Sequence, residues 1–394
     1  MTSPSVKMIH SMYEAGGEGS PSNPVKFHGQ DYKQLKRSLL KEKMLFEDET
    51  FPANLDSLGE LEGFSSANEV EWLRPGDISY DAAFIVDGVS RLDIHQGQVG
   101  NCWFLSSIGA LTLRKSLMVQ VVPPDQSFKN DYAGIFHFKF WRFGKWVDVV
   151  IDDRLPTLHH VPVSVSSRTE NEFWAPLLEK AYAKVCGSYG DMIAGTPPEA
   201  FKDFSGGVYM SYTLSKSPPD LWDIMNRAIQ CGTMMGCSTF GGDKGAEAFE
   251  KFGLVDGHAF AVTGFKQVDS HGEEVHLVRI WNPWGQKEWN GDWSDKSELW
   301  DTVSDEDREQ CLKVRDDGEF WSVVPPKAPK GKLPGSLFKG MAPTAFGDLW
   351  QIREHIEFYC FQPGEYVIIP STSEPNQTGS FVITMYSKAE AEIE

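Results

Sequence analysis

One cysteine in a glycine-rich stretch is the residue best suited to do chemistry. Cys102 follows Gln96 by six residues in the run QGQVGNCW, and an apolar segment with helical spacing begins at the cysteine. A helix N-terminus offers free N–H groups and a positive dipole end, and both favour the thiolate form of cysteine. We therefore predict that Cys102 is a nucleophile, and that Gln96 and the Cys102 N–H stabilise an oxyanion.

A cysteine nucleophile needs a general base and a group that orients the base. His258 begins a strand-like run about 150 residues after Cys102, the downstream spacing expected of papain-like enzymes. Asn282 follows in the run WNPWG and can fix the tautomer of the imidazole. A lone cysteine is usually a buried hydrophobe, and a lone histidine a core or surface residue. The prediction therefore depends on the ordered set Gln96, Cys102, His258 and Asn282.

Two halves with different patterns must position these residues. The first half is mostly helical, with helices expected over 31–50, 102–115 and 172–186 and strand-like runs over 134–140 and 145–151. The run GTPP at 195–198 predicts a break between the halves. The second half is β-rich after a helix at 219–230, with strands expected over 259–264, 275–281 and 289–293.

The same patterns predict an α+β protein in four parts. Residues 1–30 read as a flexible tail, 31–196 as a lobe with Cys102, and 197–321 as a lobe with His258 and Asn282. Residues 322–394 begin with a Pro/Gly-rich linker and continue with too few strands for a sheet core of their own. We expect this last part to pack poorly on the two lobes.

Composition narrows the possible partners and the compartment. The chain has 37 Lys and Arg against 56 Asp and Glu, a net charge of −19, which disfavours nucleic acid and anionic lipid and favours cations. Its six cysteines are too scattered for a disulfide framework. No apolar run is long enough for a transmembrane segment, and the N-terminus has no signal core. A cytoplasmic location is the resulting expectation.

Over about residues 30–321 the sequence resembles the calpains, the calcium-dependent cysteine proteases. The resemblance runs through GNCWFLSSIGALT, NEFWAPLLEKAYAKVCGSY, GLVDGHAFAVTG and IWNPWGQKEWNGDWSD. It implies a papain-like core of two lobes, with Cys102 as nucleophile, His258 as base, Asn282 as its orienting residue and Gln96 as oxyanion donor. Calpains usually carry Asp just before the cysteine. This chain has Asn101 there, and we expect at most a tuning effect.

The resemblance also implies Ca²⁺ as cofactor, bound at two sites. The first takes the carbonyls of Val86 and Gly88 and the carboxylates of Asp93 and Glu172. The second takes the Arg315 carbonyl and the carboxylates of Glu288, Asp295, Asp317 and Glu319. Such mixed oxygen ligands suit calcium, although acids of this kind are more often solvated surface charges. Arg91 and Glu319 match a pair that bridges the lobes in calpains.

The predicted function is a calcium-activated intracellular cysteine endopeptidase that performs limited proteolysis of protein substrates. One alternative is a calcium-sensing interaction protein with little proteolysis because its C-terminal region is truncated. Another is acyl transfer of the transglutaminase type, against which Asn282 and Gln96 argue. Residues 355–387 resemble only the last strands of the β-sandwich that follows a calpain core. We see no penta-EF-hand region after it, so small-subunit pairing through such a domain is not expected.

Overall fold

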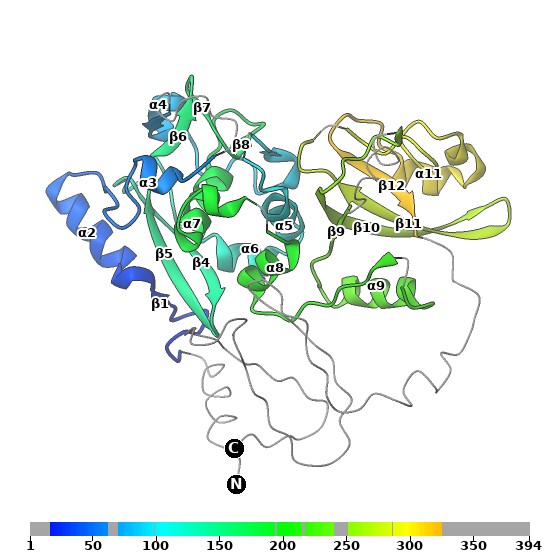
Figure 1. Cartoon of the computed structure of the whole chain (residues 1–394), viewed down its shortest axis with the longest axis horizontal. Helices are drawn as coiled ribbons and strands as arrows, with labels where there is room; N and C mark the ends of the chain where they lie inside the picture. Colours follow the sequence, from blue (N-terminus) through cyan, green and yellow to red (C-terminus); the bar gives the residue numbers. More distant parts are fainter. Residues whose placement is uncertain are drawn as a thin grey trace, which may run out of the picture.

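Two lobes lie side by side in the computed structural model (Figure 1). The described residues are 16–61, 70–97, 99–193, 195–214, 217–239, 251–285 and 287–324. We call the described residues up to 206 the first lobe and those from 217 onward the second lobe. The C-terminal part predicted at 322–394 lies outside the described residues beyond residue 324, so its predicted packing stays a prediction.

The first lobe is built around a hairpin of two long strands. β4 (Ile135–Arg142) and β5 (Lys145–Asp152) pair antiparallel, and β1 (Val25–Lys26) adds to β5 in parallel. Two smaller sheets complete the strands of this lobe: β2 (Glu71–Leu73), β6 (Leu155–Leu158) and β7 (Val161–Pro162) form one, and β3 (Ile94–His95) and β8 (Ser166–Ser167) form the other. The lobe therefore contains more strand than its mostly helical pattern predicted.

Residues 16–30, predicted as part of a flexible tail, lie along the outer edge of β5. Val25 pairs with Val147, and the N–H of Trp146 donates to the carbonyl of Gly19 over 2.9 Å. The open edge of β5 offers unpaired backbone groups, and these residues satisfy them. The tail prediction is thus wrong for residues 16–30.

Helices surround and penetrate this framework. α5 is buried along its length from Trp103 to Leu111, and α7 from Trp174 to Lys184. The helices predicted over 31–50, 102–115 and 172–186 are confirmed as shorter elements. The helices of the first lobe are α2 (Tyr32–Glu42), α3 (Leu55–Leu58), α4 (Pro75–Ile78), α5 (Cys102–Thr112), α6 (Lys115–Val121), α7 (Trp174–Cys186) and α8 (Pro197–Ser205).

The predicted break at 195–198 is the start of a helix. Pro197 and Pro198 occupy the first turn of α8, where no backbone N–H is needed, and Thr196 and Glu199 form a capping box. α8 packs against α5 and β4. It ends at Gly206 in the left-handed region, with φ 68°. The chain therefore stays with the first lobe for a further helix beyond the predicted boundary.

The second lobe is one antiparallel sheet between two helices. The helices are α9 (Leu221–Gln230) and α11 (Asp305–Cys311). Trp222 of α9 packs with Val262 and Val278 on one face, and Cys311 of α11 packs with Leu277 on the other. In sheet order, the strands are β12 (Glu319–Val323), β11 (Glu273–Trp281), β10 (Ala259–Ser270) and β9 (Gly236–Ser238).

The strand predicted over 289–293 is absent from the structure, and these residues form irregular turns. Trp293 takes a positive φ of 66°, which no strand allows. Its ring packs edge-on against Trp300 at 5.0 Å between centroids. Trp293 is therefore a core residue under the sheet, and the aromatic pattern of 289–293 does not mark strand alternation. The predicted helix at 219–230 and the strands at 259–264 and 275–281 are confirmed.

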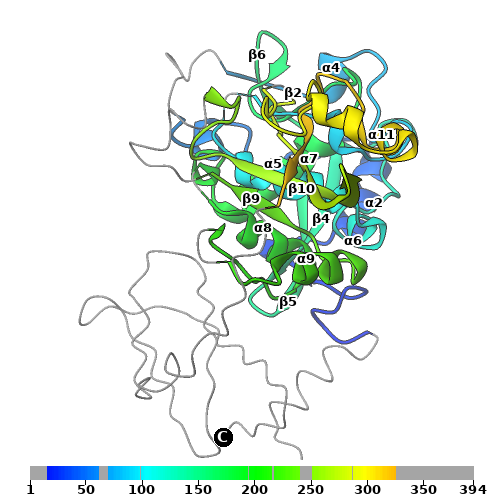
Figure 2. The ribbon, with the colours of Figure 1, turned by 90° about the vertical axis from the view of Figure 1, so that its right-hand side faces the viewer.

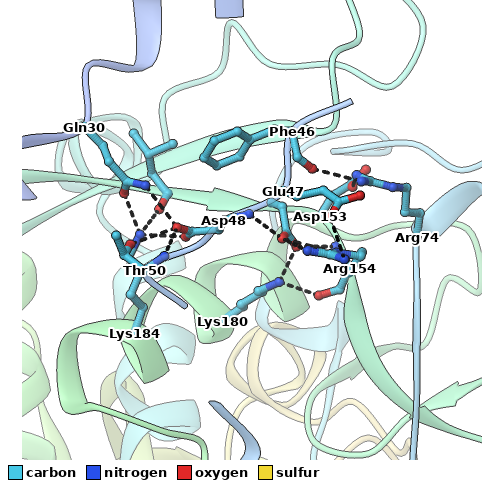
Figure 3. A network of polar contacts seen from close by, with 12 residues as sticks. Gln30, Phe46, Glu47, Asp48, Thr50, Arg74, Asp153, Arg154, Lys180 and Lys184 are labelled. Carbon is cyan, nitrogen blue, oxygen red and sulfur yellow. Dashed lines mark hydrogen bonds and ion pairs between the residues drawn. The ribbon is translucent and has the colours of Figure 1, made fainter. Parts of the chain in front are cut away.

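A buried polar network connects the N-terminal segment, here the chain after α2 that contains Asp48, to β5 and α7 (Figure 3). Lys180 Nζ lies 2.6 Å from Asp152 Oδ1, and Lys184 Nζ lies 2.6 Å from Asp48 Oδ2. Burial would raise the pKa of Asp152, but Lys180 and Arg154 lower it to about 2. Buried charges are tolerated only when they are paired in this way. The network therefore fixes α7 against both the hairpin and the N-terminal segment.

The two lobes share a continuous apolar core where β10 lies across α5 (Figure 2). Trp281, at the end of β11, is fully buried and packs against Gly109 of α5. A Cβ on Gly109 would lie 2.5 Å from the Trp281 ring, so no side chain fits there. Polar contacts add to this interface, among them the hydrogen bond from Arg168 Nη2 to the Gly285 carbonyl at 2.5 Å.

The helices in the described part of the chain are too short or too polar to span a membrane.

Candidate active site

Cys102 is the first residue of α5 and is half-buried against the second lobe. Burial raises the pKa of its thiol, while the backbone N–H groups of Ala259, Trp103 and Cys102 itself oppose this rise. The N–H groups at the helix N-terminus thus lower the pKa of the thiol, as predicted, but burial raises this pKa by more. Ala259 opens β10 and directly follows His258, so the thiol lies beside the strand that carries the histidine.

His258 and Asn282 form a buried pair. His258 Nε2 lies 2.8 Å from Asn282 Oδ1, and the two residues are 3% and 1% exposed. The Asn282 oxygen also accepts from the N–H of Trp284 at 3.0 Å, and its nitrogen donates to the Lys287 carbonyl at 3.0 Å. These contacts make Oδ1 the acceptor, so Nε2 carries the proton and Nδ1 is free to act as a base.

An aromatic ring lies against the ring of His258. The ring of Trp284 lies 4.6 Å from that of His258. Burial lowers the pKa of His258, and the hydrogen bond with Asn282 raises it. A neutral imidazole is the form that can accept the proton of a thiol. The hydrogen bond to Asn282 therefore selects the tautomer suited to general-base catalysis, and burial favours the neutral imidazole.

We expect Asn282→Ala to slow peptide hydrolysis by roughly 10- to 100-fold, because the imidazole loses its orientation. The pH profile should move as well. Removing the Asn282 hydrogen bond removes the influence that raises the pKa of His258, so the acidic limb of kcat/KM should shift to lower pH. The measurement is kcat/KM against pH, with the exposed Asn290→Ala as control. An unshifted acidic limb would contradict the assigned pairing.

Gln96 lies in the loop that leads into α5. Its Nε2 donates to the Val99 carbonyl at 3.0 Å, and the same carbonyl accepts from the N–H of Asn101 at 2.9 Å. A side-chain amide has two N–H donors, and this bond uses one of them. The loop therefore holds the Gln96 amide in place while leaving a second donor.

Thr239 contacts the backbone of His258, and the sequence reasoning missed this residue. Its Oγ1 accepts from the His258 N–H at 3.1 Å and donates to the Val255 carbonyl at 2.5 Å. Its own N–H donates to the His258 carbonyl at 3.0 Å. Thr239 thus holds the backbone of His258 on both sides. A threonine at the end of a short strand carries no sequence signal for this role.

The residues proposed for the first calcium site lie in one neighbourhood. Glu172 Oε1 accepts from the Val86 N–H at 2.7 Å, and Gly88 takes a positive φ of 96° in the same loop. Burial, with the nearby Asp93 charge, raises the pKa of Glu172 to about 7. Burial also raises the pKa of Asp93. A cation would relieve the repulsion between the buried Glu172 and the half-buried Asp93.

The residues proposed for the second site gather around the 315–319 loop. Glu288 Oε1 accepts from the N–H groups of Asp317 and Gly318, and Asp295 Oδ2 accepts from that of Arg315. Burial raises the pKa of Glu288 to about 7, and the Asp295 charge adds to this effect. Among the described residues, no three His, Cys, Asp or Glu side chains are grouped so as to hold a metal ion. The two calcium sites therefore stay predictions.

Glu319 of the second lobe forms an ion pair with Arg91 of the first lobe. Its oxygens lie 2.9 Å from Arg91 Nε and 2.8 Å from Arg91 Nη2, and Thr263 Oγ1 donates to it at 2.7 Å. Burial would raise the pKa of Glu319, but Arg91 and Arg279 hold it below its usual value. The predicted pairing of Arg91 with Glu319 is confirmed. Because the pair is bidentate and largely shielded, it is a stronger link than an exposed ion pair.

Comparison with protein families and curated proteins agrees with this geometry. Residues 46–324 match the model of the calpain family cysteine protease, and residues 320–386 match that of calpain large subunit, domain III. The chain is 45% identical to the calpain-2 catalytic subunit of Mus musculus over 322 residues, and 47% identical to the calpain-1 catalytic subunit of Gallus gallus over 313 residues.

These alignments cover 80% and 78% of this chain but 46% and 44% of the two relatives. The chain thus spans less than half the length of the curated relatives it matches. The α+β fold of two lobes, with the cysteine at the start of a buried helix and the histidine at the start of a strand, is a papain-like core. The chain belongs to the calpain family of cysteine proteases.

Proposed function

We propose that this protein is a calcium-activated cysteine endopeptidase that works through Cys102, His258 and Asn282. The buried His258–Asn282 hydrogen bond of 2.8 Å, beside the helix start that carries Cys102, is the observation that supports this most. Catalysis by a cysteine nucleophile needs a base near the thiol and a group that orients the base, and this arrangement matches that need. Casein hydrolysis that is lost in Cys102→Ala tests the proposal.

The reaction begins when Nδ1 of His258 takes the proton of the Cys102 thiol. The sulfur attacks the peptide carbonyl carbon, and the Gln96 amide and the Cys102 N–H donate to the oxygen that becomes negative. His258 then returns the proton to the leaving amine, and a thioester remains on Cys102. A water activated by His258 hydrolyses this thioester and restores the thiol.

The two clusters of carboxylates and carbonyls described above are the proposed calcium sites. Val86, Gly88, Asp93 and Glu172 would hold one ion, and Glu288, Asp295, Arg315, Asp317 and Glu319 the other. Bound Ca²⁺ supplies positive charge that relieves the repulsion between these carboxyls. Because Arg91 of the first loop contacts Glu319 of the second, the two sites act on one interface between the lobes. Ion binding there favours the arrangement in which Cys102 and His258 meet.

We expect Asp93→Ala and Glu319→Ala each to shift activation to higher calcium, because each removes a proposed ligand. Glu319→Ala also removes the ion pair with Arg91, so its shift should be the larger. Coupling between linked sites is typically about 1–3 kcal/mol, or a 5- to 150-fold shift. The measurement is the hydrolysis rate against free calcium, with the exposed Asp316→Ala as matched control. Curves that superimpose on wild type for both variants would refute the assigned ligands.

The proposed setting is the cytoplasm, and the proposed partners are protein substrates. The net charge of −19 argues against nucleic acid as a substrate or partner. Free cysteines at 102, 186, 231, 237 and 311 suit a reducing compartment. We propose limited proteolysis of exposed segments, because a peptide must enter extended between the lobes to reach Cys102.

A further inference from the structure

The residue before the nucleophile is anchored by a buried carboxylate. Asn101 precedes the first residue of α5 and is fully buried, yet its side chain makes no capping hydrogen bond. Instead, its Nδ2 lies 2.5 Å from Oε1 of Glu179, which comes from α7. Helix caps normally satisfy the free N–H groups of the first turn. The Asn101 side chain is therefore used for an attachment to another element.

Glu179 receives two further donors from the strand region that precedes β8. Ser164 Oγ donates to Oε1 at 2.5 Å, and the Val165 N–H donates to Oε2 at 3.0 Å. Glu179 is 1% exposed. The Asn101 nitrogen faces this carboxyl group, which can accept from it in its ionised form. Three donors from two separate segments thus meet on one buried acid.

The main chain of Asn101 carries this attachment into the active site. Its N–H donates to the Val99 carbonyl at 2.9 Å, the same carbonyl that accepts from Gln96 Nε2 at 3.0 Å. Its carbonyl accepts from the N–H of Phe104 at 2.9 Å and so begins α5. Asn101 is covalently joined to Cys102. One residue therefore connects the proposed oxyanion donor and the nucleophile to α7.

We propose that Asn101 and Glu179 are positioning residues that set the placement of Cys102 and Gln96 relative to each other. This inference rests on the proposed function. α7 is itself fixed through Lys180 and Lys184, as described above, so the anchor ends in the rigid part of the first lobe. A site whose supporting contacts are fixed keeps its reacting groups in place, and displacement of about 1 Å is enough to cost about 100-fold in rate.

An amide and a carboxyl group at position 101 should give the hydrolysis rate a different dependence on pH. Burial raises the pKa of Glu179 to about 7, against the lowering effect of Ser164, Val165 and Asn101. Tyr189 faces Glu179, and burial together with this charge holds its pKa well above the usual range, so it stays neutral. An aspartate at 101 would donate to Glu179 only while the two acids share a proton. The amide donates at every pH.

The test compares Asn101→Asp and Asn101→Leu with wild type at saturating calcium. In Asn101→Leu, kcat should fall about 100-fold with KM little changed, because the reacting groups are misplaced while the substrate cleft remains. Asn101→Asp should keep near wild-type kcat at low pH. As pH rises and the shared proton is lost, its rate relative to wild type should fall by up to about tenfold per pH unit.

A second readout needs no peptidase activity. The pH dependence of Cys102 alkylation by iodoacetamide should gain a new alkaline step in Asn101→Asp, because the second negative charge forms beside the thiol. The control is Asn54→Leu, which removes a true cap from α3 and should lower Tm without changing either profile. A cooperative thermal transition, recorded as Tm, shows for each variant that it is folded.

Two results would contradict the proposal that Asn101 and Glu179 position Cys102 and Gln96. One is a wild-type kcat in Asn101→Leu. The other is an Asn101→Asp variant whose kcat and alkylation rate keep a constant ratio to wild type at every pH. A wild-type protein that is alkylated at Cys102 but hydrolyses no peptide would refute the proposed function, while the alkylation profiles would still decide whether the anchor exists.

Discussion

Replacing Cys102 with alanine is expected to abolish peptide hydrolysis, with a loss on the order of a million-fold in kcat. Losses of this size are seen when the nucleophile of a catalytic triad is removed, because base and oxyanion donors have no covalent step left to assist. The fold should survive, since the half-buried thiol contributes little packing that a methyl group cannot replace. The measurement is the rate of casein hydrolysis at saturating calcium.

A cysteine elsewhere provides the matched control. Cys231 is exposed, so Cys231→Ala should retain full activity. A thiol-directed epoxide should label Cys102 alone among the six cysteines of the wild-type chain. Activity that survives in Cys102→Ala, together with label spread over several cysteines, would show that another residue is the nucleophile.

The second large effect is expected at the contact between the lobes, from Gly109→Ala. Alanine is the better helix former by about 1 kcal/mol, so the change should favour α5 taken alone. In the folded protein, however, the new Cβ would lie 2.5 Å from a ring carbon of Trp281. The second lobe must shift to relieve this overlap. Because a displacement of about 1 Å costs about 100-fold in rate, activity should fall at least that far.

Gly76 offers the comparison, because it lies in helix α4 with open space around its Cα. Gly76→Ala should leave activity unchanged. We would measure kcat together with the protease resistance of the second lobe, which should decrease in Gly109→Ala only. Full activity in Gly109→Ala would mean that the lobes do not need this packing to align Cys102 with His258.

The helical start at Cys102 and the strand start at His258 could be predicted from sequence because local signals mark them. Glycines precede the cysteine, and periodicity changes from 3.6 to 2 between the two halves. The GTPP run shows the limit of such signals. Proline favours both a break and the first turn of a helix, and only the capping residues Thr196 and Glu199 distinguish the two outcomes.

The supporting contacts of the site could not be predicted in the same way. Glu179 lies 78 positions from Asn101, and Trp281 lies far beyond Gly109 in sequence. Neither pair has a local pattern, because both arise where separate elements pack. The Arg91–Glu319 pair, separated by 228 positions, was predicted only through the family resemblance. Tertiary packing, not local propensity, determines which polar groups meet.

In the proposed function, calcium binding connects these contacts to activity. Glu172 is buried and Glu288 is half-buried, each beside other acids, so each proposed site costs less to assemble when a cation is bound. The Arg91–Glu319 pair joins the lobes, and Glu319 is itself a proposed ligand of the second site. We therefore expect activation to be cooperative in calcium, because the two sites share one conformational equilibrium.

The most direct test of the central claim is the initial rate of casein hydrolysis by the wild-type chain, measured across free calcium from chelator to saturation with Cys102→Ala as blank. The account predicts no hydrolysis above the blank in chelator and a steep rise to a calcium-saturated rate. A rate equal to that of Cys102→Ala at every calcium concentration would contradict the assignment as a peptidase, and full activity in chelator would contradict the calcium switch.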